Sequence, residues 1–212
     1  MTKNVRNTVL LISAFIALLL GLLVHKMLNP PPLSTAALHE RGIYLFDEPR
    51  EVNPVTLAAN NGKPFTKANL QGKWSLVFFG FTHCPDVCPT TLAMLNAAQK
   101  LLPDELKNST QVIMVSVDPA RDTVEKMASY VPYFNPAFIG VTGDFIQILS
   151  FAGNLNAAFQ KVMSGDKDSY VVDHSANIFL INPHGDYQGF FKPPFNASGF
   201  AANYREMRRV YL

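Results

Sequence analysis

Two patterns of apolar residues alternate along the chain between residues 74 and 181. Near-continuous apolar runs are typical of strands buried on both faces of a sheet, and four of them predict strands, at residues 74–79, 111–117, 138–141 and 177–181. Apolar residues spaced three or four apart are typical of helices that cover a sheet. This spacing predicts a helix at residues 91–102 and a further helical patch at 155–162, and N-cap residues predict helices at 122–130 and 144–152. Helices alternating with buried strands predict an α/β fold.

Turn and cap residues complete the predicted elements. Clusters of Asn, Pro and Gly are typical of turns, and they bound three further short strands, at residues 54–58, 64–66 and 187–191. Asp122 and Asp144 are predicted N-caps, Glu125 completes a capping-box-like pattern, and a C-terminal helix begins at Asn196 or Ser198. Because a hairpin closes the alternation of strands and helices, the order predicts an α/β sandwich with a mixed central sheet.

The N-terminal segment has a different composition. Residues 7–25 carry no Asp, Glu, Lys or Arg, and as a helix they would span about 28 Å at ~1.5 Å per residue, close to the thickness of a hydrocarbon core. Lys3 and Arg6 precede this stretch, and Lys26 follows it. The stretch predicts a single-pass anchor, and the positive-inside rule predicts a cytoplasmic N-terminus with the domain across the membrane. Because the segment does not resemble an Arg- and Ser-rich mitochondrial leader, we expect a bacterial inner membrane and a periplasmic domain. A cleaved signal peptide is the alternative, but its apolar region would be shorter.

Composition divides the chain into three predicted regions. Residues 1–28 form the cytoplasmic N-terminus and the transmembrane anchor, and residues 29–41 form a stalk that contains a stiff, extended Pro30-Pro31-Pro32 segment. Residues 42–212 are long enough for one domain with its own core. The formal net charge is +2 and no long basic run occurs, so nucleic acid is not an expected partner.

The chain has two cysteines, Cys84 and Cys88, and they lie between the strand at 74–79 and the helix that follows. A cysteine pair at the first strand-to-helix junction is the arrangement of thioredoxin-like folds. The pair can close a small disulfide loop or bind a soft metal through two thiolates. Pro89 suits the first turn of a helix, so Cys88 is expected near the helix start, where the helix dipole favours its thiolate.

Histidines are the candidates for a third soft ligand, and the chain has five. His25 and His39 lie in the predicted anchor and stalk, and His184 lies in a turn. His83 adjoins Cys84, but adjacent side chains in an extended segment diverge. His174 immediately precedes the strand at 177–181, in a loop that a thioredoxin-like sandwich brings close to the cysteines.

Three motifs resemble those of the Sco/SenC family, in the same order and spacing. They are Cys84-Pro85-Asp86-Val87-Cys88-Pro89, Ser116-Val117-Asp118-Pro119-Ala120-Arg121-Asp122-Thr123 and Val172-Asp173-His174-Ser175. The resemblance covers residues 45 to 212 and implies a thioredoxin-like, membrane-anchored copper protein that helps to assemble the copper centre of cytochrome c oxidase. It implies that Cys84, Cys88 and His174 bind copper, as Cu(I) or Cu(II). The implied partners are the copper-centre subunit of the oxidase and a copper donor protein.

Two functions remain open from the sequence. The first is a copper metallochaperone, for which two thiolates and one imidazole make a three-coordinate site that leaves room for an incoming ligand. The second is a thiol–disulfide oxidoreductase in which Cys84 and Cys88 form the redox pair. His174 favours the first, because a pure oxidoreductase needs no third soft ligand. Asp173 is either a partner that orients the His174 ring or a strand-end cap.

Overall fold

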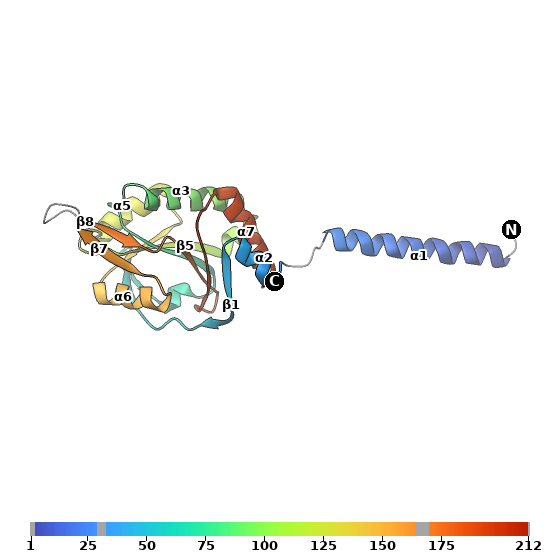
Figure 1. The fold of residues 1–212 in the computed structure, drawn as a ribbon, viewed down its shortest axis with the longest axis horizontal. Coiled ribbons are helices and arrows are strands. Elements are labelled where there is room, and N and C mark those ends of the chain that lie inside the picture. The colour runs from blue at the N-terminus through green and yellow to red at the C-terminus, as the bar shows by residue number, and fades with distance from the viewer. Residues whose placement is uncertain (1–2, 29–32, 164–169, 212) are drawn as a thin grey trace. The chain divides into compact units, whose positions relative to one another are not determined.

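The computed structural model describes residues 3–28, 33–163 and 170–211, and it divides into two compact units, Met1–Leu33 and Ser34–Leu212. In the first unit, α1 is one helix, Lys3–Leu28, with no buried residue (Figure 1). Its mean hydropathy over 18 residues reaches 2.5, so the helix is long and apolar enough to cross a membrane. The predicted proline spacer falls on residues 29–32, outside the described residues.

The second unit is built on an eight-stranded sheet with the strand order β1-β10-β9-β4-β5-β6-β2-β3. The strands are β1 Ile43–Arg50, β2 Thr56–Ala59, β3 Pro64–Thr66, β4 Trp74–Gly80, β5 Thr110–Ser116, β6 Ile139–Thr142, β9 Ile178–Ile181 and β10 Tyr187–Phe191. Strands β4, β5 and β6 are parallel, and the other pairs are antiparallel. The mixed central sheet is therefore confirmed.

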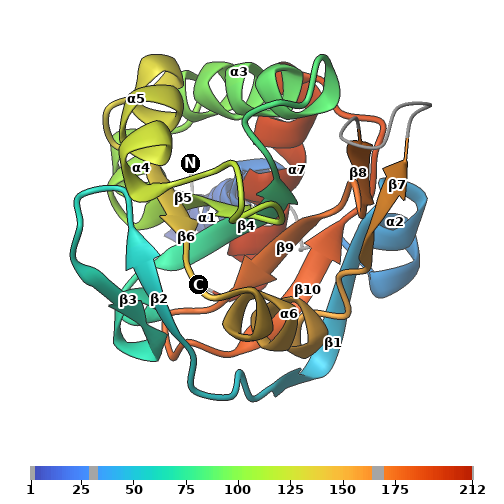
Figure 2. The same ribbon diagram turned by 90° about the vertical axis from the view of Figure 1, so that its left-hand side faces the viewer.

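Helices cover both faces of this sheet. They are α2 Thr35–Glu40, α3 Val87–Lys100, α4 Asp104–Asn108, α5 Val124–Phe134, α6 Phe145–Asn154 and α7 Ala197–Arg209, with a short 3-10 helix at Lys67–Leu70. Figures 1 and 2 show α3, α5 and α7 on one face and α6 on the other. Between the sheet and α6 lies a core in which Phe79 packs against Phe151 and Phe179. Every residue of β4 is buried, which explains its near-continuous apolar sequence.

The parallel register of β4 and β5 positions the functional loops. Gly80 pairs with Ser116, so both strands end at the same edge of the sheet. The loop that carries the cysteines leaves β4 there, and the turn that contains Asp118 and Asp122 leaves β5 beside it. Chain segments that are far apart in sequence therefore meet at the carboxyl ends of the parallel strands, where open α/β sheets place their sites.

One predicted helix is wrong. Residues 155–162 do not form a helix; instead β7, Phe159–Met163, pairs antiparallel with β8, Tyr170–His174, in a separate two-stranded sheet. Asn156 adopts a left-handed conformation, with φ of 53°, directly after α6 ends, and this conformation stops a right-handed helix. The apolar residues that suggested helical spacing lie partly in the turn after α6, which begins at its C-cap Leu155, and partly in β7.

The predicted caps are confirmed in part. Asp144 accepts hydrogen bonds from the backbone N–H groups of Ile146 and Gln147, as an N-cap should. The cap of α5 is Thr123 rather than Asp122: the Thr123 hydroxyl accepts from the Lys126 N–H. Asp122 is fully buried beneath the helix start, so its carboxylate is directed to other partners.

Candidate metal centre

The two cysteines lie at the junction of β4 and α3. Cys88 is the second residue of α3, and Pro89 follows it in the first turn, as predicted. The backbone N–H of Cys88 donates to Cys84 Sγ at 3.4 Å, which places the Cys84 sulfur at the N-terminal end of the helix. The Cys88 sulfur lies against Gly80: a Cβ at that position would come within 2.9 Å of the sulfur. Glycine at the end of β4 therefore makes room for Cys88.

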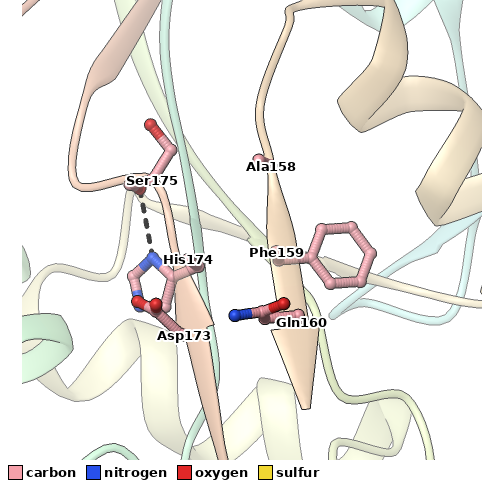
Figure 3. Close-up of a pocket in the computed structure, with 6 residues that line it drawn as sticks. All are labelled: Ala158, Phe159, Gln160, Asp173, His174 and Ser175. Carbon is pink, nitrogen blue, oxygen red and sulfur yellow. Dashed lines mark hydrogen bonds between the residues drawn. The ribbon is translucent and has the colours of Figure 1, made fainter. Parts of the chain in front are cut away.

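His174 reaches the cysteines from the second sheet. It is the last residue of β8, and Figure 2 shows β8 beside the loop that joins β4 to α3. The His174 Nε2 atom is 3.6 Å from Cys88 Sγ. The Nδ1 atom is 3.1 Å from the Ser175 carbonyl oxygen, a hydrogen bond drawn in Figure 3. Because a carbonyl only accepts, Nδ1 carries the proton, and the Nε2 lone pair is left for a metal.

The three side chains form a compact donor set. Their ligand atoms, the sulfurs of Cys84 and Cys88 and one nitrogen of His174, all lie within 4.8 Å of one another. Donors about 2.0–2.3 Å from one metal ion are roughly 3.5–4 Å apart in a trigonal arrangement. Shifts of less than an ångström would thus complete a site. Among the residues that the structure describes, this is the one group of three such side chains placed to hold an ion.

Burial controls the protonation of Cys88. The side chain is 1% exposed, and this burial raises the pKa of its thiol far above the ordinary value, with a smaller contribution from charge on Cys84. The Phe81 backbone N–H lowers the pKa of this thiol, but by less than burial raises it. The sequence-based expectation of a readily formed Cys88 thiolate is therefore wrong for the metal-free protein, because desolvation outweighs the helix dipole. A bound cation would offset that cost.

A buried carboxylate fixes the start of the cysteine loop. Asp122 accepts from the Thr82 hydroxyl at 2.6 Å, from the Thr82 backbone N–H at 3.0 Å and from the Ser116 hydroxyl at 2.7 Å. Thr82 lies two residues before Cys84, so Asp122 ties the loop to the end of β5. Sequence reasoning missed this role and assigned Asp122 to a helix cap. The available signal was its position after a buried strand that adjoins β4.

Aromatic and charged side chains pack beneath the loop. The Phe81 ring meets the His174 ring edge-on, with centroids 6.2 Å apart. The Arg121 guanidinium lies 5.8 Å from the centre of the Phe81 ring and forms an ion pair with the buried Asp118. Arg121 thus supports the ring that flanks His174, as part of the strand-to-helix turn that the sequence predicted.

Other residues considered from the sequence lie outside the donor set. The His83 side chain is 47% exposed, and its Nδ1 lies 3.9 Å from Asp122 Oδ1. His184 lies in the turn after β9. Asp173 is exposed, and the Ser175 carbonyl takes the ring-orienting position that the sequence left open for it. A cavity of about 410 Å³ opens beside the site, and Figure 3 shows its lining: Ala158, Phe159, Gln160, Asp173, His174 and Ser175.

The fold and this donor set define a class: an α/β sandwich protein with a soft, cysteine-based site at the first strand-to-helix junction. Comparison with known proteins identifies the family within this class. The family model described as SCO1/SenC matches residues 45–209. The chain belongs to the SCO1/SenC family, and the predicted thioredoxin-like fold is confirmed.

Individual relatives agree with this assignment. The chain is 36% identical over 161 residues to Protein SCO2, mitochondrial, of Saccharomyces cerevisiae, covering 75% of this chain and 53% of that protein. The crystal structure of Arabidopsis thaliana ScoI with copper bound has a TM-score of 0.68 and 34% identity, covering 74% of this chain and 98% of the solved one. The crystal structure of yeast Sco1 with copper bound has a TM-score of 0.70 and 28% identity, covering 77% of this chain and 91% of the solved one. The chain spans about half the length of the mitochondrial relatives that it matches.

Proposed function

We propose that this chain is a copper metallochaperone that binds copper through Cys84, Cys88 and His174. The observation that carries the proposal is the convergence of two sulfurs and a proton-free imidazole nitrogen within 4.8 Å. Thiolate and imidazole ligands select soft or borderline metals, and a three-coordinate set suits Cu(I). Structural zinc takes four protein ligands in most sites, and no fourth Cys, His, Asp or Glu joins this group among the described residues. The two copper-bound relatives of the same fold support copper as the ion.

The residues present divide the tasks of holding and releasing the ion. Cys88 is buried and held against Gly80, whereas Cys84 is only partly buried. His174 borders a cavity that opens beside the site. An incoming ligand can therefore approach from the side of Cys84 and His174 while Cys88 keeps the copper bound. Family membership supports the copper-centre subunit of cytochrome c oxidase as the recipient, after loading by a copper donor protein.

The proposed location follows from α1. Its length and apolar composition suit a single membrane-spanning helix, and Lys3 and Arg6 at its N-terminal end support a cytoplasmic N-terminus. The copper-binding domain would then lie in the periplasm of a bacterium, held at the inner membrane. Periplasmic copper delivery fits an oxidase whose copper centre faces the same compartment.

Copper stoichiometry and X-ray absorption test the proposal. The full chain is purified in detergent, reduced, and offered one equivalent of Cu(I). One retained copper with two sulfur neighbours and one nitrogen neighbour is the expected result. A protein that retains no copper would contradict the proposal, and a site with sulfur neighbours alone would remove His174 from it.

A second candidate function is thiol–disulfide exchange by Cys84 and Cys88. The observation that favours it is that both thiols are free, with their sulfurs within 4.8 Å, so a small rotation could form an S–S bond of about 2.05 Å. Cys84 is the more exposed of the two and would attack a partner disulfide, and Cys88 would resolve the mixed disulfide. Failure to retain copper together with a readily reversible Cys84–Cys88 disulfide would favour this function.

A further inference from the structure

Tyr130, on α5, has a hydroxyl group that no motif or ligand assignment explains. The hydroxyl oxygen is buried, and it has no hydrogen-bond partner among the residues that the structure describes. The ring packs edge-on against Phe134, with centroids 5.4 Å apart. A buried hydroxyl without a partner lowers stability, and a phenylalanine would give the same ring contact without that cost. The hydroxyl therefore needs an explanation outside the metal-free fold.

The surroundings of this hydroxyl include the donor set. Helix α5 packs against α3, whose second residue is Cys88. Burial raises the pKa of the Tyr130 phenol, and negative charge on Cys88, Cys84 and Asp122, in that order, raises it further. The Asp122 carboxylate already accepts from Thr82 and Ser116. The two sulfurs are the remaining acceptors in this group.

Metal binding changes what those sulfurs can accept. In the metal-free protein, a thiol sulfur is a weak acceptor. With copper bound, two thiolates and one Cu(I) ion carry a net negative charge, and Cys88 is almost wholly buried. A buried negative charge needs hydrogen-bond donors. The backbone supplies two, since Cys88 N–H donates to Cys84 and Phe81 N–H donates to Cys88. The Tyr130 phenol is a further O–H donor without another partner in the described structure.

We propose that the Tyr130 hydroxyl donates a hydrogen bond to the Cys88–Cys84 thiolate pair when copper is bound, and so favours the loaded state. Tyr130 is thus a positioning residue that acts through the ligand sulfurs and does not touch the metal. The inference rests on the proposed copper site. It gives the orphan hydroxyl a partner that exists only after the thiols have lost their protons.

Tyr130→Phe tests this role, with Tyr133→Phe as the matched control. Tyr133 lies on the same helix and is 85% exposed, so its hydroxyl is solvated. Cu(I) affinity is measured on the full chain in detergent by competition with a colorimetric Cu(I) chelator. Because a hydrogen bond to a charged group contributes about 1.5–3 kcal/mol, affinity should fall roughly 10- to 100-fold in Tyr130→Phe and stay unchanged in Tyr133→Phe.

Three further readouts separate this role from a general structural one. The thermal midpoint of metal-free Tyr130→Phe should equal or exceed that of the wild type, because the variant removes an unsatisfied polar group. The thiolate-to-Cu(II) charge-transfer band should move to longer wavelength, because the sulfur loses a donor. The midpoint potential of the Cys84–Cys88 pair, measured without copper, should not change, because the proposed hydrogen bond forms only when copper is bound.

The outcomes distinguish the inference from the proposed function. Unchanged copper affinity in Tyr130→Phe, beside a wild type that binds copper, would overturn the inference alone. A lower metal-free thermal midpoint would also overturn it, since the hydroxyl would then have a partner in the metal-free fold. A wild-type protein that binds no copper would overturn the proposed function itself.

Discussion

The two regions that contribute to the donor set are built differently. The cysteine loop leaves a fully buried strand, is tied to the neighbouring strand by Asp122, and runs directly into α3. His174 instead comes from the two-stranded β7–β8 sheet, in which Val172 is buried but Gln160 and Asp173 are exposed. A two-stranded sheet has little stability of its own. From this difference we expect the sulfurs to form the fixed part of the proposed site and His174 the exchangeable part.

The largest expected effect is loss of a sulfur from the fixed part. Cys88→Ser should abolish tight copper binding and any Cys84–Cys88 disulfide, because the site loses one of the two soft thiolates that favour Cu(I), and Cys84 loses its disulfide partner. Copper retained after gel filtration, together with a thiol count, checks this. Stoichiometric copper in the variant would mean that the fixed part of the site lies elsewhere.

Loss of the histidine should have a smaller effect that separates the two regions. His174→Ala should weaken copper binding by more than the roughly 10- to 100-fold typical of losing a hydrogen-bond partner behind a ligand. The Cys84–Cys88 disulfide should still form, because the loop does not depend on the β7–β8 sheet. His83→Ala is the control, since His83 adjoins Cys84 but lies outside the donor set. Equal affinities of His174→Ala and wild type would refute the three-ligand site.

Removing the brace of the loop tests why the cysteine region is fixed. Asp122→Ala leaves the hydroxyls of Thr82 and Ser116 and the Thr82 N–H without their acceptor. We expect the free energy of unfolding to fall by about 3 kcal/mol, measured by urea denaturation of the metal-free protein. Asp173→Asn, at an exposed position, should change it by less than about 0.5 kcal/mol. Similar losses in both variants would contradict the difference between the regions.

The smallest effect concerns pH. Burial raises the pKa of Cys88 in the folded protein. Below about pH 8.5 the thiol is protonated in both the folded protein and the unfolded chain, so its contribution to stability is fully present there. As pH rises from about 8.5 to 10, the unfolded chain releases its proton first, and stability should fall by up to about 1.4 kcal/mol per pH unit. Urea denaturation of metal-free protein across this range measures the slope. Cys88→Ala should flatten it, and an unchanged slope in that variant would exclude Cys88 as its source.

The comparison also shows which elements a sequence can predict. The buried strands β4, β5 and β9 were predicted because burial on both faces leaves continuous apolar runs. The edge strand β1 was missed: its exposed half reads Asp47-Glu48-Pro49-Arg50, and it depends on pairing with β10. The strand β7 was mistaken for a helix for a related reason, since β8 determines its conformation. Elements whose conformation depends on a partner strand leave a weak local signal.

The sequence by itself determined the alternation of strands and helices, the apolar N-terminal segment and the three candidate ligands. The first two follow from local periodicity and composition. The cysteine pair follows from its spacing and chemistry, and the complete ligand set with His174 follows from the resemblance of three motifs to the Sco/SenC family. Only the tertiary structure decided that Nε2 is the nitrogen that faces the sulfurs, that burial raises the pKa of Cys88, and that Asp122 braces the loop. The first and third of these depend on side chains that are distant in sequence, and the second depends on the exclusion of water. A local pattern of residues encodes neither kind of information.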